Sequence, residues 1–221
     1  MTGTDTGVGK TLTACALLHA LAARGVVAMP MKPIAAGAEK RNGRWINEDT
    51  ARLLAAAGRD ESFCDQVTPV LLREPMAPHI AAAREGVKIS LPRIVDAFRA
   101  LAESGDFMVI EGVGGFCVPL DEQADTVHLA RLIGLPVVMV VGMRLGCLNH
   151  ALLTAQAIAA AGLELKGWIA NAIDPRMAAR EDNVAALVSR LEAPLLGQLP
   201  HAPQGDAKLL ARYLDLAPLL R

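Results

Sequence analysis

The segment from Gly3 to Thr11, GTDTGVGKT, constrains the fold more than any other part of the chain. A glycine-rich loop that runs into a helix holds a triphosphate, because its backbone N–H groups turn toward phosphate oxygens and the helix N-terminus adds partial positive charge. Lys10 can reach the β- and γ-phosphates, and the Thr11 hydroxyl can bind a magnesium ion. Five residues separate Gly3 from Gly9, where the Walker A motif has four. The sequence therefore predicts a lengthened phosphate loop.

A buried strand is expected before such a loop, yet only Met1 and Thr2 precede Gly3. Either the start has been assigned too far downstream, or the sheet does without this strand. We favour the downstream start, because an open parallel sheet without its first central strand would lose substantial burial.

The composition fits one large α/β domain, and we expect residues 1–221 to form a single domain. A hydrophobic content of 52% and a mean hydropathy of +0.33 indicate a sheet buried on both faces, with a buried subunit interface as a further expectation. No apolar run approaches the roughly 18 residues that span a bilayer, and no signal region opens the chain. We predict a cytoplasmic protein without a membrane partner.

The charge and the aromatic content argue against a nucleic-acid partner. The net charge is −1 and aromatic residues make up 3% of the chain, so there is neither a basic excess nor a stacking surface. The four cysteines are widely spaced and form no C-x-x-C pair. We expect them to be reduced, apolar residues rather than zinc ligands or disulfide partners.

Helical and strand patterns alternate along the chain, which implies a mostly parallel β-sheet with helices on both faces, as in P-loop NTPases. Asn47 and Ser90 are the expected caps of two helices. A polar stretch over residues 39–44 is expected to be a surface loop. The predicted helices are 10–24, 47–57, 90–103, 125–133, 148–161 and 177–191, and the predicted strands are 26–31, 107–110, 136–141, 167–170 and 195–199.

Polar residues follow three of the predicted strands: Lys32, Glu111 and Asn171. Ligands of open α/β sheets bind outside the carboxyl ends of the strands, so these are candidate site residues. Glu111 has the pattern of an acidic residue on the magnesium side of a phosphate site, and Lys32 could neutralise a transferring phosphoryl group. Asp49, in the first turn of its helix, could serve the same site. Each has an ordinary alternative: an exposed lysine, a solvated carboxylate, or a carboxylate favoured by the helix dipole.

Two further segments suggest ligand contacts. Asn171-Ala172-Ile173-Asp174 is similar to the base-reading tetrad of GTPases but lacks its lysine, so we expect ATP rather than GTP, with the Asn171 amide contacting adenine. The glycine-containing turn at residues 145–147, just before Asn149, is a plausible anion site, although Asn149 and His150 could simply cap a helix.

The chain resembles the dethiobiotin synthetases over essentially its whole length. The lengthened loop, the KP-x-x-x-G segment and the LGC-x-NH segment together carry this resemblance, which extends to EPMAPHI, VIEGVGG, GWIANAI and APLLGQLP. It implies a homodimeric, magnesium-dependent ATP enzyme of biotin synthesis. Such an enzyme carboxylates 7,8-diaminononanoate with CO2, phosphorylates the carbamate and closes the ureido ring, giving dethiobiotin, ADP and phosphate.

The resemblance also implies roles for individual residues. Lys10 and Lys32 would be catalytic and clamp phosphate and carbamate, while Thr11, Asp49 and Glu111 would hold magnesium. Asn149 and the turn before it would hold the substrate carboxylate in the site of the partner subunit. The implied nucleotide contacts are Gly7, Val8, Gly9, Lys10, Thr11, Leu12, Asp49, Glu111, Gly112, Val113, Gly114, Asn171, Ala172, Pro200, His201 and Ala202, and the implied substrate contacts are Ala36, Gly146, Cys147 and Asn149.

The chain departs from the family pattern at two positions. Ala36 stands where the family often has a hydroxyl that contacts substrate, so one polar contact is expected to be absent. Gly7 replaces an acidic residue found in many members.

Two other classes are alternatives. A ParA- or MinD-like switch ATPase would act through protein partners, but such proteins usually carry a second lysine early in the loop, where this chain has Thr4 and Asp5. A related amidotransferase synthetase acting on a cobalamin precursor would need a glutaminase domain, for which this length leaves no room.

Overall fold

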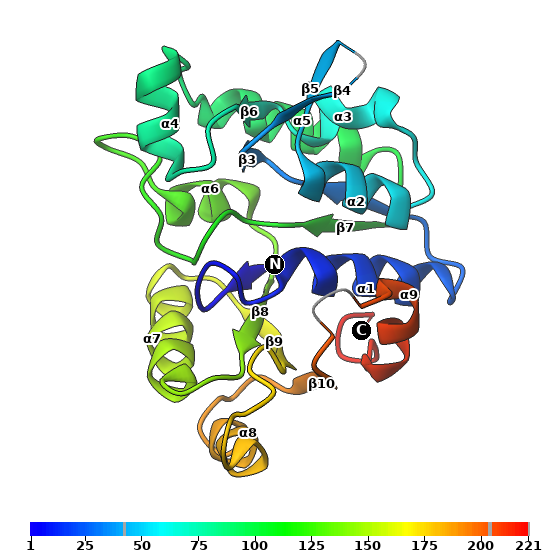
Figure 1. Cartoon of the computed structure of the whole chain (residues 1–221), viewed down its shortest axis with the longest axis vertical. Helices are drawn as coiled ribbons and strands as arrows, with labels where there is room; N and C mark the ends of the chain where they lie inside the picture. The colour runs from blue at the N-terminus through cyan, green and yellow to red at the C-terminus, as the bar shows by residue number, and fades with distance from the viewer. Residues whose placement is uncertain (42, 203–204, 221) are drawn as a thin grey trace.

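The computed structural model describes residues 1–41, 43–202 and 205–220. Among these residues the parallel strands form three groups: four strands in the order β1-β8-β9-β10, the pair β2-β7 and the pair β3-β6. Helices surround them (Figure 1). The strands are β1 (Thr2–Gly3), β2 (Ala28–Met31), β3 (Ile34–Ala36), β4 (Glu39–Arg41), β5 (Arg44–Ile46), β6 (Val70–Leu72), β7 (Phe107–Ile110), β8 (Val137–Gly142), β9 (Leu165–Asn171) and β10 (Leu195–Leu199).

The four-stranded group and the pair β2-β7 meet at the N-terminus. The Met1 amine donates to the Ile110 carbonyl at 2.6 Å, and the Gly112 N–H donates to the Met1 carbonyl at 3.0 Å. On the other side, Thr2 and Gly3 pair with Met139 and Val140 of β8. The sheet thus runs β2-β7-β1-β8-β9-β10, and the position before the phosphate loop is held by a strand of two residues.

This short β1 leaves a gap between the first residues of β7 and β8. Two cavities, of about 120 and 410 Å³, open there, one beside α6 and the other beside α1 and α5. Both are lined by Met1, Met108, Ile110, Leu135 and Pro136. We call this space the β7–β8 gap. Its walls are mainly apolar, as expected for the interior of a parallel sheet.

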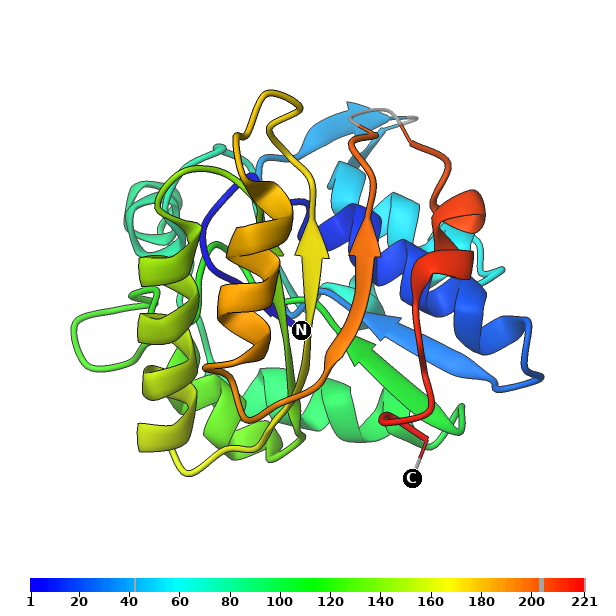
Figure 2. The ribbon, with the colours of Figure 1, turned by 90° about the horizontal axis from the view of Figure 1, so that it is seen from below.

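Helices cover both faces of the sheet, as the alternation of patterns predicts (Figure 2). Trp168 and Ala170 of β9 pack with residues of α7 and α8, whereas Ile169 packs with α1. Successive strand residues point to opposite faces, so one strand serves both hydrophobic layers. The helices are α1 (Lys10–Ala22), α2 (Glu48–Ala56), α3 (Cys64–Val67), α4 (Pro78–Glu85), α5 (Leu91–Ala102), α6 (Thr126–Ile133), α7 (Cys147–Ala160), α8 (Arg180–Val188) and α9 (Ala207–Leu210), with 3-10 turns η1 (Glu61–Phe63) and η2 (Ala211–Tyr213).

The predicted helix starts are confirmed where a side chain caps the helix. Asn47 accepts the Thr50 N–H, Ser90 accepts the Arg93 N–H, and Asp125 accepts the His128 N–H. Such caps satisfy backbone donors that the first helical turn leaves unpaired. Strands β7 and β10 match their predicted limits, and the other predicted elements are displaced by one to three residues at their ends.

The expectation of a loop at 39–44 was wrong. Residues 39–41 and 44–46 form the antiparallel pair β4-β5, in which Lys40 lies opposite Trp45. The pair projects from the body of the molecule (Figure 1), and its mostly exposed, charged side chains give no buried strand pattern. The parallel pair β3-β6 and helix α4 were also missed. Strands of three residues are too short to show a period.

The four cysteines are unpaired in the structure: Cys15, Cys64 and Cys147 are buried, and Cys117 is exposed. Among the described residues, no helix is both long enough and apolar enough to cross a membrane.

Candidate nucleotide and magnesium site

The phosphate loop joins β1 to α1 and is tied to the end of β9. Gly9 caps α1 with φ 86°, a left-handed conformation that favours glycine. A Cβ atom at Gly9 would collide with Nδ2 of Asn171. That same Nδ2 atom donates to the Val8 carbonyl at 2.8 Å. Only glycine therefore allows the loop to approach β9 this closely.

Lys10 points back into the loop. Its Nζ atom donates to the Asp5 carbonyl at 2.9 Å, and its side chain is buried. Burial lowers the pKa of Lys10, while the nearby Glu111 carboxylate acts in the opposite direction. A buried ammonium held by one carbonyl leaves donors free for phosphate oxygens, since an ammonium has three N–H groups.

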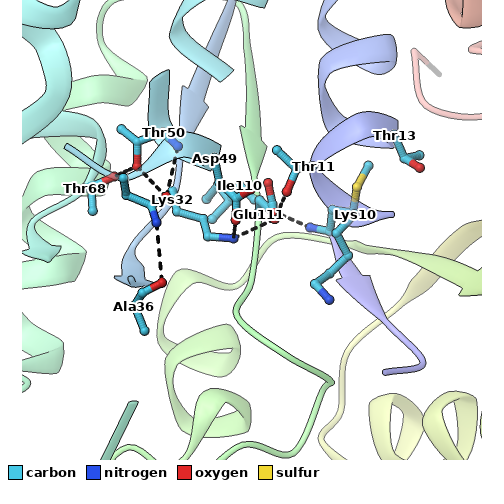
Figure 3. Close-up of polar contacts among 12 residues, drawn as sticks. Lys10, Thr11, Thr13, Lys32, Ala36, Asp49, Thr50, Thr68, Ile110 and Glu111 are labelled. Atoms are coloured by element: carbon cyan, nitrogen blue, oxygen red, sulfur yellow. Dashed lines mark hydrogen bonds and ion pairs between the residues drawn. The ribbon is translucent and has the colours of Figure 1, made fainter. Parts of the chain in front are cut away.

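Lys32, just after β2, lies between two carboxylates (Figure 3). Its Nζ atom is 2.6 Å from Oε1 of Glu111 and 3.0 Å from Oδ2 of Asp49. Burial disfavours the Lys32 ammonium, but the charges of Glu111 and Asp49 outweigh this and raise the pKa of Lys32. Burial also disfavours the Asp49 carboxylate, but Lys32 outweighs it and lowers the pKa of Asp49. The lysine is therefore positively charged at neutral pH.

The oxygens around Glu111 fit a magnesium ion. The Thr11 hydroxyl donates to Glu111 Oε1 at 2.9 Å, while Glu111 Oε2 is buried without a hydrogen-bond partner. An unpaired buried carboxylate oxygen is costly unless something else satisfies it. In the described part of the chain, no group of three or more His, Cys, Asp or Glu residues is placed to hold a metal. Two carboxylates and a hydroxyl suit Mg²⁺, which takes few protein ligands and completes its shell with phosphates and water.

A cleft of about 1090 Å³ opens above these residues. It brings together most of the residues predicted for the site, from the phosphate loop, the strand ends and the segment after β10. The predicted residues that line it are Gly7, Gly9, Lys10, Thr11, Leu12, Lys32, Ala36, Asp49, Glu111, Val113, Gly114, Asn171, Ala172, His201 and Ala202.

Some predicted residues lie outside this cleft. Val8 is buried behind the loop and offers only its carbonyl, to Asn171. Gly112 lines the β7–β8 gap, and Pro200 lines a separate cavity of about 220 Å³. At the other end of the cleft, Nδ1 of His201 is 2.9 Å from the Ala172 carbonyl, which joins the segments after β9 and β10.

The turn at the start of α7 is also outside the cleft. The side chain of Cys147 is buried in the core with α8, and its N–H donates to the Arg144 carbonyl at 3.0 Å. Asn149 is exposed on the first turn of α7. Within one chain, Gly146, Cys147 and Asn149 are therefore not brought to Lys32.

An ion pair beside the phosphate loop could not be seen in the sequence patterns. Nη2 of Arg144 contacts Oδ2 of Asp5. Arg144 is the second residue after β8, so it is the polar residue at the end of that strand, as Lys32, Glu111 and Asn171 are for theirs. Polar residues at the carboxyl ends of parallel strands are candidate site residues, and this signal, applied to β8, identifies Arg144. Arg52, three residues after Asp49, lines the cleft and was not predicted either.

Solved structures of similar fold include a ParA family ATPase from Chlorobium tepidum TLS, with a TM-score of 0.54, 14% identity and coverage of 96% of this chain and 88% of that chain. The septum site-determining protein MinD of Pyrococcus horikoshii OT3, complexed with Mg-ADP, has a TM-score of 0.56, 20% identity and coverage of 92% and 80%. Identities this low show a shared P-loop fold and no more.

Other proteins match this chain at a much higher sequence identity than these solved structures do. A family model described as an AAA domain matches residues 1–208. The chain is 54% identical over 216 residues to the ATP-dependent dethiobiotin synthetase BioD of Aromatoleum aromaticum, covering 98% of this chain and 96% of the relative. Proteins of the same name from Ralstonia nicotianae and Nitrosospira multiformis are 52% and 51% identical, covering 100% and 98% of this chain and 96% and 94% of the relatives. With the cleft, the phosphate loop and these full-length matches together, the chain belongs to the ATP-dependent dethiobiotin synthetase family.

Proposed function

We propose that this chain makes dethiobiotin from 7,8-diaminononanoate, CO2 and ATP, releasing ADP and phosphate. The observation that carries the proposal is Lys32, held between Asp49 and Glu111 at the base of the cleft that also contains Lys10 of the phosphate loop. A buried positive charge at this place suits a reaction in which negative charge moves from ATP to an acceptor oxygen.

The reaction needs activation because a carbamate oxygen is a poor leaving group. One amine of the substrate attacks CO2 and forms the carbamate, with loss of a proton. A carbamate oxygen then attacks the γ-phosphorus of ATP, and ADP leaves. The second amine attacks the carbonyl carbon of the resulting mixed anhydride, so that the ureido ring closes, inorganic phosphate leaves and a second proton is lost. Each step mainly requires alignment of reactants and neutralisation of charge.

The proposed role of each residue in the cleft follows from its position relative to the phosphate loop and the strand ends. Lys10 binds the β- and γ-phosphates, and Lys32 stabilises the carbamate and the phosphoryl group as it transfers. Thr11, Asp49 and Glu111 hold Mg²⁺, which neutralises phosphate charge when bound. Asn171, with the neighbouring backbone of Ala172 and residues 200–202, contacts adenine. The Asn171 carboxamide has a second N–H and an oxygen beyond the bond to Val8, so it can serve both.

We further propose a homodimer in which Asn149 and the turn before it hold the substrate carboxylate in the partner's site. The turn is exposed: Leu145 is 96% accessible and Leu153, further along α7, is 56% accessible. Exposed leucines beside a polar turn suit a subunit interface better than solvent. A single domain, a cytoplasmic location and the absence of a nucleic-acid partner are further expectations from composition.

The proposal is tested by measuring dethiobiotin and ADP with diaminononanoate, bicarbonate and ATP each omitted in turn. All three are expected to be required, and ADP release is expected to depend on the diamine. The Lys10→Ala variant should lose activity by about 10²-fold or more while remaining folded, because one preorganised charge on the phosphates is removed. Lys88→Ala, at an exposed loop position, is the matched control and should be unaffected. ADP release that ignores the diamine would instead favour a switch ATPase.

A further inference from the structure

The ion pair between Asp5 and Arg144 joins two segments that the proposed reaction uses separately. Asp5 lies in the lengthened part of the phosphate loop, and Arg144 lies between β8 and the turn that starts α7. Both side chains are about half exposed, at 45% and 41%. The other oxygen of Asp5, Oδ1, accepts the Thr6 N–H at 2.7 Å, so the carboxylate is oriented from both sides.

The backbone carbonyl of each residue in the pair accepts a hydrogen bond from a segment with a proposed function. The Asp5 carbonyl accepts the hydrogen bond from Lys10 Nζ. The Arg144 carbonyl accepts the N–H of Cys147 and so closes the turn at residues 144–147. A continuous series of contacts therefore runs from the phosphate-binding lysine, through Asp5 and Arg144, to the first turn of α7.

This pair is poorly placed to contribute stability. Ion pairs with exposed side chains contribute little to folding, because water and salt screen them. The Thr6 N–H and the Arg144 guanidinium nevertheless hold the pKa of Asp5 below its usual range, so the carboxylate is charged at neutral pH. The significance of the pair lies in the segments that it connects.

We propose that Asp5 and Arg144 are positioning residues that transmit nucleotide binding to the turn at residues 145–149. In the structure, Lys10 donates to the Asp5 carbonyl; bound phosphates compete for this ammonium and place negative charge beside the Asp5 carboxylate. Arg144, the cation paired with this carboxylate, then shifts with its carbonyl, and the turn follows. The proposal rests on the proposed function, which assigns the substrate carboxylate to this turn. Nucleotide binding then strengthens diamine binding, as linkage between two sites requires.

The test uses the full chain and two readouts at saturating AMP-PCP with Mg²⁺. The first is amide hydrogen exchange over residues 145–150 with and without the nucleotide analogue. The second is the affinity for diaminononanoate under the same two conditions. The variants are Asp5→Asn, which keeps an oxygen for the Thr6 N–H, Arg144→Gln, their double variant, and Arg144→Lys as the conservative change. Arg99→Gln is the control, since Arg99 pairs with Asp96 at an exposed i,i+3 position on α5.

In the unmodified chain and in Arg99→Gln, the nucleotide analogue should slow exchange in the turn and strengthen diamine binding about fivefold or more. Both effects should disappear in Asp5→Asn and in Arg144→Gln, and the double variant should be no worse than either single one. Arg144→Lys should keep part of the effect.

The proposal is overturned if either single variant responds to the nucleotide as the unmodified chain does, or if the two substitutions act additively. It is also overturned if Arg144→Gln loses nucleotide affinity while Asp5→Asn does not, since Arg144 would then bind phosphate directly. Product formation separates this proposal from the proposed function. A chain that makes dethiobiotin without any response in the turn refutes only the link, and a chain whose turn responds without making dethiobiotin refutes only the function.

Discussion

The ammonium of Lys32 lies 2.6 Å from the carboxylate of Glu111, with both side chains almost entirely removed from solvent. Neither group is stable there alone, because an unpaired buried charge is costly. The two residues are 79 positions apart in the sequence and meet because β2 and β7 are adjacent parallel strands that end at the same edge. The pair is thus both a structural element and the base of the proposed reaction site.

Lys32→Gln should reduce turnover much more than ATP affinity. The lysine contacts the transferring phosphoryl group and the carbamate in our proposal, and an interaction made mainly in the transition state lowers kcat. Steady-state kinetics with an independent ATP-binding titration will measure both. A collapse of ATP affinity with unchanged kcat would show that Lys32 only binds nucleotide.

The same substitution should destabilise the fold by about 3–5 kcal/mol, because it leaves the Glu111 carboxylate buried without its partner. Adding Glu111→Gln should recover most of that loss without recovering activity. Urea unfolding of the two variants beside the unmodified chain gives the comparison. A double variant as unstable as the single one would mean that the ion pair does not explain the loss.

Glu111→Gln and Asp49→Asn should each raise the magnesium concentration needed for half-maximal activity, since a neutral amide is a weaker ligand for Mg²⁺. Asp96→Asn, at an exposed site on α5, is the control and should titrate as the unmodified chain does. A variant whose magnesium titration is unchanged would have no part in holding the ion.

Mixing Lys32→Gln and Asn149→Ala subunits should restore part of the activity that each variant lacks. If Asn149 serves the partner's site, a mixed dimer contains one site with both residues intact. Differentially tagged subunits, purified as mixed dimers, make the assay direct. Mixed dimers without recovered activity would place both residues in one subunit's site.

Ala36→Ser should strengthen diamine binding by about 1 kcal/mol if the new hydroxyl reaches the substrate. Ala36 ends β3 and lines the cleft with Lys32, so a hydroxyl there is near the proposed reacting groups. Calorimetric titration of the diamine will test this. Ala38→Ser, beyond the end of the same strand, serves as the comparison and should leave the affinity unchanged.

An apolar four-residue extension fused before Met1 should stabilise the protein by filling the β7–β8 gap. Burial of apolar side chains contributes roughly 25 cal/mol per Å² and is partly offset by the cost of ordering the added backbone. We expect a net gain of about 2 kcal/mol, or a rise in Tm of roughly 4–8 °C. A Gly-Ser extension of equal length adds no apolar area and is the control; equal effects of both would show that the gap does not accept a strand.

The extension should also change the pH dependence of stability. Burial lowers the pKa of the Met1 amine from 8.0 to about 6, with Glu111 acting in the opposite direction. Between these values the unfolded chain binds more protons than the folded one, so stability rises with pH from about 6 to 8. An extended chain has no amine at that place and should lack this component. Chemical unfolding at several pH values will show whether it does.

Much of the fold could be predicted because its strong signals are local. Glycine loops, side-chain caps and apolar runs placed most helices and the central strands within a few residues. The β4-β5 pair was missed because neither strand buries a regular face, and β3 and β6 because three residues show no period. Their pairing is set by the surrounding chain.

The site could be predicted as a set of residues but not as a set of contacts. Lys32, Glu111 and Asn171 could be predicted from their positions just after strands, because parallel strands bring their carboxyl ends to one edge of the sheet. Nothing in the sequence showed that Lys32 would bridge two carboxylates, or that Asn171 would bond to the backbone of Val8. Such contacts depend on side-chain directions across different strands, which spacing along the chain does not encode.

The close approach of Gly9 to Asn171 has a consequence for attempts to transplant this loop. The lengthened loop is held near its end by Asn171 and, at Asp5, by Arg144, and neither support lies within the GTDTGVGKT segment. Grafted alone onto another P-loop protein, these residues would lose both supports and adopt other conformations. A portable version of the motif must carry an asparagine from one strand end and an arginine from another, so the loop is a unit of three-dimensional structure rather than of sequence.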